Sequence, residues 1–253
     1  MNSLWIRRTP GAGPARAGLR WVLPLVCLAA LCGGCAVGTT VLEPENHEGF
    51  NRGVWGFNMW LDDHAFEPMG RGWDAITSRG VQQSVANFAD NLDFPKRFLG
   101  NLFQVKLPGA GIELSRFVIN TTVGILGFFD PALAWGIEPR PEDFDQTFAY
   151  WGSNAGCYWV LPFLGPSSTR GNVALPFDFV TSGSNLLFII PQVNWRAMNL
   201  ERIATNRENA IDFYVFVRNA YEQRRDDLNH DFKERPEDDA AEDDLYFLDE
   251  DDE

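Results

Sequence analysis

Residue types that carry enzyme chemistry are few in this chain, and their spacing does not fit known catalytic patterns. The three histidines, His47, His64 and His230, do not form the H-E-x-x-H pattern that sets two zinc ligands on one face of a helix. The serine strings GSNAG and GPSSTRG differ from the G-x-S-x-G turn of serine hydrolases, and there is no phosphate-binding P-loop. These absences predict a protein without a metal site, a cofactor or an enzymatic activity.

Two carboxylate pairs and two nucleophilic side chains remain as candidates. The pairs Asp62, Asp63 and Glu142, Asp143 are interpreted as helix caps or solvated side chains, which explain such pairs more often than acid–base catalysis does. A phospholipase would need Ser167 or Cys157 beside a general base, and the sequence supplies no such partner. Binding or transport is therefore favoured over catalysis.

Residues 146–167, QTFAYWGSNAGCYWVLPFLGPS, contain no charged side chain. A chargeless stretch of this length suggests a membrane-spanning helix, but glycines and prolines interrupt it too often for one. It is therefore either a buried core or an irregular segment facing lipid, and the nine Trp of the chain favour the lipid. Arg170 is the first base beyond it, and would either attract a phosphate or bond the carbonyls at a helix end.

The hydrophobic residues elsewhere recur at helical spacing, whereas alternating, strand-like runs are rare. Helices are predicted at about residues 47–64, 81–92, 98–105 and 111–120. Thr205 and Glu208 have the spacing of a capping box, which predicts that the last helix starts there and continues to about Leu228. The predicted fold class is all-α, with one short irregular or hairpin loop.

Residues 1–34 have the pattern of a secretory signal peptide. Arginines precede an apolar core at residues 21–31, which is too short to span a bilayer. The sequence LCGGC then resembles a lipobox, which predicts cleavage before Cys35 and covalent lipid on that cysteine. Acyl chains hold a protein on a membrane without a spanning helix. The alternative is a soluble periplasmic protein cleaved nearby. We expect a lipidated linker at 35–46 and one helical domain at 47–235.

The remaining residues, 236–253, hold 11 acidic side chains and no basic one. This composition predicts a solvated, disordered tail. The apolar island at 245–248 offers a less favoured alternative, in which the tail docks a basic partner. The whole chain has 21 basic against 35 acidic residues and no basic stripe, so nucleic-acid binding is not expected.

Six segments, taken in order, resemble the MlaA (VacJ) family of outer-membrane lipoproteins. They are HEGFNR at 47–52, NLDFP at 91–95, FVINTTVGILGFFDPA at 117–132, EDFDQTFAYWG at 142–152, YWVLPFLGPSSTR at 158–170 and RENAIDFYVFVRNAYEQRRDDL at 207–228. The resemblance implies a single ring-like helical domain that lies in one leaflet, on the periplasmic face of the outer membrane, and surrounds a polar channel beside a trimeric porin.

The function that the resemblance implies is phospholipid transport. Phospholipids misplaced in the outer leaflet would pass through the channel to a soluble periplasmic carrier, which maintains the lipid asymmetry of the membrane. The alternative is a structural lipoprotein that tethers envelope layers or stabilises porins without moving lipid.

Under this resemblance, polar residues of the chargeless regions become candidates to line the channel, unless they only cap helices. They are Asn120, Thr121, Thr122, Gln146, Thr147, Asn154 and Arg170. Gly152 and Gly156 are candidate hinges of a gate loop. The family favours glycine where this chain has Asp145, Ala149 and Asn154, so a stiffer loop is expected here. Asp145, a carboxylate near the channel, has no explanation in the sequence.

Overall fold

The computed structural model describes residues 47–187 and 189–230. The signal peptide, the linker with Cys35 and the acidic tail lie outside the described residues, so the predictions for them stand as predictions. Within the part of the chain that is described, no helix combines the length and the apolarity needed to cross a bilayer.

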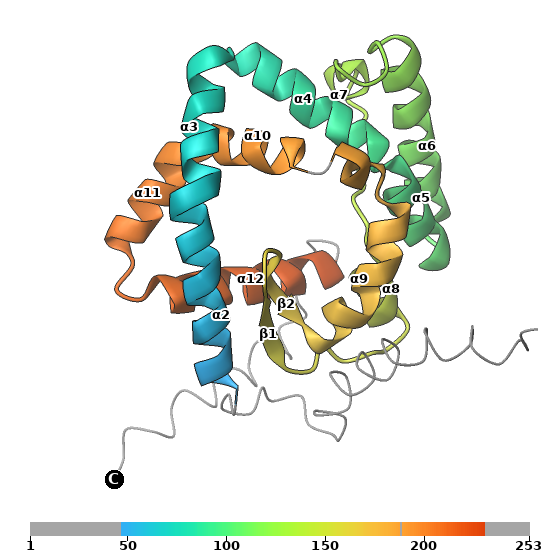
Figure 1. Cartoon of the computed structure of the whole chain (residues 1–253). Coiled ribbons are helices and arrows are strands. Elements are labelled where there is room, and N and C mark those ends of the chain that lie inside the picture. The colour runs from blue at the N-terminus through green and yellow to red at the C-terminus, as the bar shows by residue number, and fades with distance from the viewer. Residues whose placement is uncertain (1–46, 188, 231–253) are drawn as a thin grey trace, which may run out of the picture. The chain divides into compact units, whose positions relative to one another are not determined.

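Helices make up most of this part of the chain (Figure 1). The first half contains α2 Glu48–Leu61, the π-helical η2 Asp62–Phe66, α3 Glu67–Ile76, α4 Arg79–Leu92, α5 Phe94–Phe103, α6 Leu107–Thr122 and α7 Pro131–Ala134. The second half contains α8 Phe144–Tyr150, strands β1 Tyr158–Leu161 and β2 Gly165–Ser168, α9 Thr169–Thr181, the 3-10 turn η3 Gly183–Leu187, α10 Ile190–Met198, α11 Leu200–Asn209 and α12 Phe213–Asn229. The helical fold class is confirmed, and the one short hairpin among these residues is antiparallel, with Tyr158 opposite Ser168.

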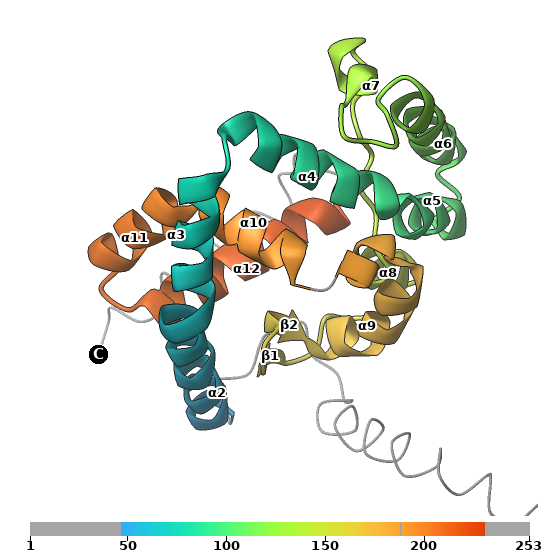
Figure 2. The same cartoon turned by 45° about the horizontal axis from the view of Figure 1, so that its top comes forward.

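The elements of residues 47–230 follow a closed circuit, which Figures 1 and 2 show from two directions. The continuous run of α2, η2 and α3 leads into α4 and α5, and α5 packs on α8. Helix α8 packs on α9, α9 follows the hairpin, and β1 packs back on α2. Helix α10 lies against α3 and α4, while α12 contacts α8 and β2. The ring-like arrangement of helices is therefore present in this part of the chain.

Ion pairs connect the continuous run of α2, η2 and α3 to α10 and α11. The guanidinium of Arg196 in α10 donates to Asp62 and to Glu67, at 2.9 Å in each case. Arg207 of α11 donates to Asp63 at 2.8 Å. These three carboxylates lie close together, and Arg71, which pairs with Glu67 at 2.7 Å, is a third arginine that offsets their charge. The pair Asp62, Asp63 thus has a structural role that links distant helices.

The last helix begins later than predicted. Thr205 and Glu208 lie inside α11, which ends at Asn209. Ala210 has extended backbone angles, and α12 begins after Asp212, which accepts hydrogen bonds from the amides of Tyr214 and Val215. The predicted capping box is wrong because the aspartate after the extended residue provides the cap, and the chain bends there instead.

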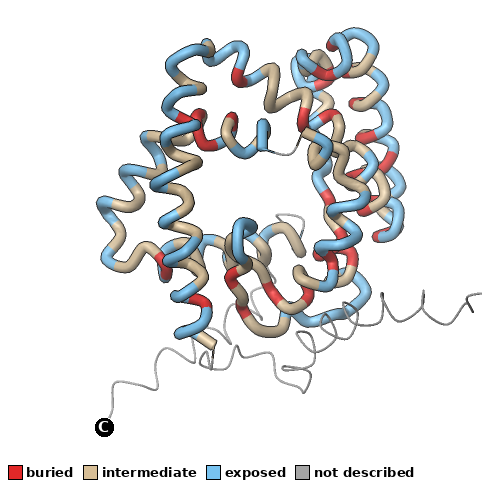
Figure 3. Tube along the Cα trace, in the orientation of Figure 1, coloured by how far each residue is buried: buried red, intermediate tan, exposed pale blue. Residues whose placement is uncertain are grey.

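Polar and apolar side chains are distributed in the opposite way to most water-soluble domains. Among the described residues, the buried hydrophobic side chains are few and mostly small, and one cluster forms around Val160. Many polar and charged side chains are buried, and much of the buried chain follows α5, α6, α8 and α9 (Figure 3). Large apolar side chains such as Trp60 and Phe179 are exposed along most helices. Exposed apolar surface of this extent indicates contact with lipid or protein.

Candidate functional site

Helix α8 begins and ends with complete capping motifs. Asp143 accepts a hydrogen bond from the amide of Gln146, while the Gln146 side chain accepts one from the amide of Asp143. At the other end, Gly152 has a φ of +88°. Its amide donates to Ala149 and the amide of Ser153 donates to Phe148, which is the Schellman pattern. Helix termination therefore accounts for the glycine at 152, and the expected cap at Asp143 is confirmed.

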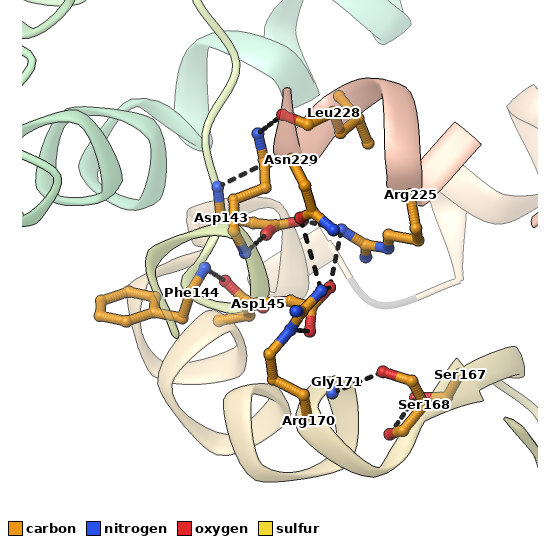
Figure 4. Close-up of polar contacts among 12 residues, drawn as sticks. Asp143, Phe144, Asp145, Ser167, Ser168, Arg170, Gly171, Arg225, Leu228 and Asn229 are labelled. Carbon is orange, nitrogen blue, oxygen red and sulfur yellow. Dashed lines mark hydrogen bonds and ion pairs between the residues drawn. The ribbon is translucent and has the colours of Figure 1, made fainter. Parts of the chain in front are cut away.

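The carboxylate of Asp145 is buried and paired with Arg170 of α9. Arg170 donates from Nε to one carboxylate oxygen at 2.7 Å and from a terminal nitrogen to the other at 3.3 Å (Figure 4). The same guanidinium donates to the carbonyl of Ser153 at 2.9 Å and to the side chain of Asn229 at 3.4 Å. One arginine thus joins α8, the segment after it and the end of α12.

A second arginine on α12 completes this group, which we call the Asp145 cluster: Asp143, Asp145, Arg170, Arg225 and Asn229. Arg225 donates to Asp143 at 2.6 Å and lies 3.5 Å from the carboxylate of Asp145. Burial alone would lower the pKa of Arg225, but the two carboxylates outweigh it and raise that pKa. Arg225 therefore stays charged and bound to carboxylates.

The hairpin is fixed to α2 by two side-chain amides. The buried Asn51 donates to the carbonyl of Tyr158 at 3.1 Å and accepts from the amide of Val160 at 3.0 Å. Asn58 donates to the carbonyl of Leu161 at 2.9 Å and accepts from the amide of Phe163 at 2.9 Å.

These two asparagines replace a neighbouring strand. Seven residues of α-helix rise about 10.5 Å, and three residues of strand extend about 10 Å. Asn51 and Asn58 therefore meet β1 at matching points along its free edge. We call this contact the carboxamide ladder. It satisfies the backbone of an edge that would otherwise need water or another strand.

The segment that enters the hairpin is bound to the start of α9. The amide of Thr169 donates to the carbonyl of Cys157, and the amide of Arg170 donates to that of Ala155, each at 3.0 Å. Gly156, between them, has a φ of +70°, and a β-carbon there would lie 2.7 Å from the side chain of Thr169. This close approach explains the glycine at 156.

The polar residues predicted to line a channel fall into two groups. Asn154 and Thr122 are exposed, although the hydroxyl of Thr122 donates to the carbonyl of Val118 at 2.7 Å. The others are buried or partly buried and hold the scaffold together. Asn120 donates to Asp130 at 2.9 Å, and Thr121 accepts from Asn91 at 3.0 Å.

Gln146 and Thr147 belong to the buried group as well. Gln146 donates to Glu142 at 2.8 Å and to the carbonyl of Leu228 at 3.2 Å. The hydroxyl of Thr147 donates to the carbonyl of Asp143 at 2.9 Å and accepts from Gln104. These bonds link α8 to α5 and α12. The two candidate hinges, in contrast, lie at opposite ends of the same short loop, next to Arg170.

The serine considered as a nucleophile has no histidine beside it among the described residues. The hydroxyl of Ser167 is hydrogen-bonded to the side chain of Asn172 at 2.7 Å. His47 instead stacks on Trp159, and His64 on Trp60. The geometry therefore offers a helical scaffold with a restrained hairpin and no visible catalytic pair in this part of the chain.

Residues 44–228 of this chain match the family described as MlaA lipoprotein. The chain belongs to the MlaA family. A solved structure from work on the structural basis for maintenance of bacterial outer membrane lipid asymmetry superposes with a TM-score of 0.65. It is 25% identical and covers 74% of this chain and 100% of its own.

Curated relatives agree with the family. The intermembrane phospholipid transport system lipoprotein MlaA of Haemophilus influenzae is 32% identical over 220 residues, which cover 80% of this chain and 87% of that protein. The protein of the same name from Escherichia coli is 28% identical over 236 residues, covering 85% and 93%. An uncharacterized protein of Rickettsia felis is 32% identical and covers 72% of this chain and 76% of its own.

Within this MlaA scaffold, the structure brings forward residues that were not predicted to have a role. Asn51 and Asn58 lie on a helix whose prediction rested on its apolar residues, so their function as a ladder for β1 was missed. The i, i+7 spacing of two asparagines is the signal that was available. Asp145, which had no explanation, is the carboxylate partner of Arg170.

Asp178 of α9 is a further, half-buried carboxylate beside the Asp145 cluster. It accepts a hydrogen bond from the amide of Phe144 at 3.0 Å. Burial raises its pKa to about 6, and the charge of Asp143 adds to this, whereas the hydrogen bond from Phe144, Lys96 and Arg225 act against it. Folding therefore favours the protonated form of Asp178 relative to the unfolded chain.

Replacing Asp178 by asparagine should stabilise the protein at pH 7.5 by about 1–2 kcal/mol, after allowance for solvent screening. The pKa is higher in the folded state, so the stabilisation from proton binding is complete below about pH 4 and is lost as the pH rises through 6. Asparagine is neutral throughout and still accepts from Phe144. Thermal unfolding in detergent at pH 4.5, 6 and 7.5 measures the difference, with the exposed Asp227→Asn as control. Parallel curves for wild type and Asp178→Asn would contradict the expectation.

Proposed function

We propose that this chain is a non-enzymatic lipoprotein that removes misplaced phospholipids from the outer leaflet of the outer membrane. It carries its lipid on Cys35, lies on the periplasmic face in one leaflet beside a trimeric porin, and passes phospholipid through a polar path to a soluble periplasmic carrier. Family membership supports transport of phospholipid, as do the names of the Haemophilus and Escherichia relatives. The porin and the periplasmic carrier are inferred from the same family resemblance.

The observation that carries this proposal is the closed circuit of helices in which many polar side chains are buried and many large apolar ones are exposed. Irregular backbone and polar groups at membrane depth are tolerated when they are packed on protein or line a wet cavity. A ring that presents apolar side chains to lipid and keeps polar groups on its inner side satisfies this condition. It gives a lipid head group a route that avoids hydrocarbon.

The polar residues predicted to line the channel have two different roles. Asn154 and Thr122, which are exposed, are the better candidates to meet a head group. Asn120, Thr121, Gln146 and Thr147 support them by fixing the surrounding helices. Arg170 has its guanidinium bound to Asp145, so it acts on the loop by holding Ser153 rather than as a free phosphate ligand.

The gate is the loop between Gly152 and Gly156, and Gly156 is its critical glycine. Valine at 156 combines an unfavourable positive φ with a contact of 2.7 Å to Thr169. We expect Gly156→Val to reduce lipid transfer strongly. Gly72→Val is the matched control, since a β-carbon there meets nothing within 4 Å, and it should leave transfer near the wild-type rate.

The assay places purified, acylated protein, with its porin, in liposomes of phosphatidylethanolamine and phosphatidylglycerol beside the soluble carrier. Labelled phospholipid recovered on the carrier measures transfer, and its intact mass shows that no bond was hydrolysed. Circular dichroism establishes that each variant is folded. Transfer that requires this protein supports the proposal. Folded, membrane-bound protein that transfers nothing would favour a structural tether, and a hydrolysed product would favour a phospholipase.

A further inference from the structure

Helix α12 has one face that stays exposed from its first turn to its last. The exposed residues recur at i, i+1, i+4, i+5, i+8, i+9 and i+12, which is the spacing of a single helix face. They are Val215, Phe216, Asn219, Ala220, Gln223, Arg224 and Asp227, and we call them the α12 stripe. On its other side the helix contacts α8 and β2 and buries Tyr214 (Figure 1). The described part of the chain therefore leaves the stripe uncovered.

The stripe is apolar at the start of the helix and polar towards its end. Val215 and Phe216 are 38% and 43% exposed, and Ile211, which comes just before the helix cap, is fully exposed. Carboxamide side chains follow one and two turns later, and then Arg224. Hydrocarbon would deprive these polar groups of their hydrogen bonds. A segment that covers the stripe therefore has to be apolar at one end and acidic at the other.

Arg224 differs from the other arginines of α12 in having its donors open. Arg218 pairs with Glu222 at 2.9 Å. Arg225 pairs with Asp143 at 2.6 Å. Arg224 is exposed and forms no ion pair with another described residue. Because a guanidinium binds a carboxylate through several donors at once, this position favours an acidic side chain in whatever covers the stripe.

The chain itself contains a segment of this composition. Residues 245–248, LYFL, are apolar and aromatic, and residues 242–244 before them, EDD, are acidic. Both belong to the acidic tail, which lies outside the described residues. We propose that the α12 stripe is the docking site of this tail segment, with its apolar residues on Val215 and Phe216 and its acids at Arg224. The inference is independent of the proposed transport function, because it concerns a contact within one chain.

The connection has the length that this contact needs. Phe216 lies thirteen residues before Asn229, the last residue of α12, which is about 20 Å along the helix axis. Sixteen residues lead from Asn229 to Leu245. As a flexible coil they have a root-mean-square span of about 20–24 Å, and fully extended they reach about 53 Å. Because the coil length matches the span, the effective concentration of the tail at the stripe is near its maximum.

The order of the residues matches as well. A chain that turns back after α12 passes Arg224 before it reaches Phe216, and along the tail the acids at 242–244 come before the apolar residues. Arg224 lies about 12 Å from Phe216 along the helix axis. Three to four residues of extended chain cover about 10–13 Å, which is the distance from Asp243 to the middle of the apolar segment. Asp227, one turn beyond Arg224, repels acids and so disfavours an alignment shifted towards the end of the helix.

The tether gives the tail an advantage over other occupants of the stripe. A separate protein loses translational freedom when it binds, whereas the tail is already held close to the surface. A protein that bound the stripe would therefore have to displace the tail. In this arrangement the tail is an internal cover of the exposed face of α12.

The test is photochemical crosslinking from position 216 in the full-length, acylated protein. A benzophenone amino acid replaces Phe216 and keeps an aromatic side chain there. The protein is reconstituted in liposomes of phosphatidylethanolamine and phosphatidylglycerol without porin or carrier, irradiated and digested, and mass spectrometry identifies the crosslinked peptides. A mixture of isotopically light and heavy chains separates contacts within one chain from contacts between two. The same probe in place of Phe179 of α9, which is also exposed, is the matched control.

We expect a product between position 216 and residues 236–253 of the same chain. Phe247→Ser and Arg224→Gln should each lower its yield severalfold, and so should higher salt, which screens the ion pairs. Arg140→Gln removes an exposed arginine beside Gly109 of α6 and should leave the yield unchanged. The probe at position 179 should give no product with the tail.

Four results would overturn the inference. They are a product of position 216 with lipid, a product with a second chain, the absence of a tail product, and a tail product whose yield Phe247→Ser leaves unchanged. Equal yields from positions 216 and 179 would equally refute a specific site. Every substitution lies on the surface or in the tail, and circular dichroism before irradiation establishes that each variant is folded.

Discussion

Replacing Arg170 by methionine should lower the free energy of unfolding by about 3–5 kcal/mol. The substitution leaves the carboxylate of Asp145, which is 1% exposed, without its two-point partner. Arg225, 3.5 Å away, compensates only in part. Arg170→Met also removes the hydrogen bond from the guanidinium to the carbonyl of Ser153. Chemical unfolding of the purified protein in detergent, followed by circular dichroism, measures the loss.

Two further variants separate this effect from the loss of a charge alone. Arg71→Met removes an arginine that pairs with Glu67 on the surface, and should cost about 1 kcal/mol or less. Adding Asp145→Asn to Arg170→Met removes the stranded charge and should recover part of the stability. If Arg170→Met were as mild as Arg71→Met and instead abolished lipid transfer, Arg170 would be a phosphate ligand and the structural role would be refuted.

A second large effect is expected at Asn51. Asn51→Leu leaves the carbonyl of Tyr158 and the amide of Val160 buried without their partner. An unsatisfied buried polar group costs about 1–3 kcal/mol, so the two together should destabilise the protein by about 2–5 kcal/mol. The damage should concentrate in the hairpin. Amide hydrogen exchange should become faster at Val160, while residues of α4 remain protected.

Asn58→Leu is the matched variant at the other end of the carboxamide ladder. Its partner amide belongs to Phe163, an exposed residue, so water can replace the lost bond and the cost should stay near 1 kcal/mol. Exchange should become faster at Phe163 and change little at Val160. Equal effects of the two substitutions, or uniform exchange across the protein, would show that the asparagines do not act as separate points of attachment.

The periodicity of apolar residues was enough to place the first helices, but it placed the start of the last one wrongly. Phe50, Val54, Phe57 and Leu61 recur along one face, and α2 covers them. Such a signal is local, since it depends on residues three to four apart. At the C-terminal end, the sequence predicted the cap at Thr205, whereas in the structure the extended backbone at Ala210 separates two helices and Asp212 caps the second.

The polar contacts of the candidate site depend on segments that are remote in the sequence. Asn51 meets Val160 across 109 residues, and Arg170 meets Asp145 across 25. No pattern of spacing predicts such pairs, because they form only when folding brings two elements to a separation of about 3 Å. The sequence therefore showed a lone arginine and an unexplained aspartate, and only the structure showed that each is the partner of the other.

By itself, the sequence determined the helical class and the family segments, since composition, local periodicity and short motifs are properties of neighbouring residues. The lipobox and the two hinge glycines at 152 and 156 stay predictions from the same kind of signal. The tertiary structure decided which polar groups are bonded inside the protein and which apolar groups remain outside. That division depends on the packing of whole helices against one another, which no local pattern of residues specifies.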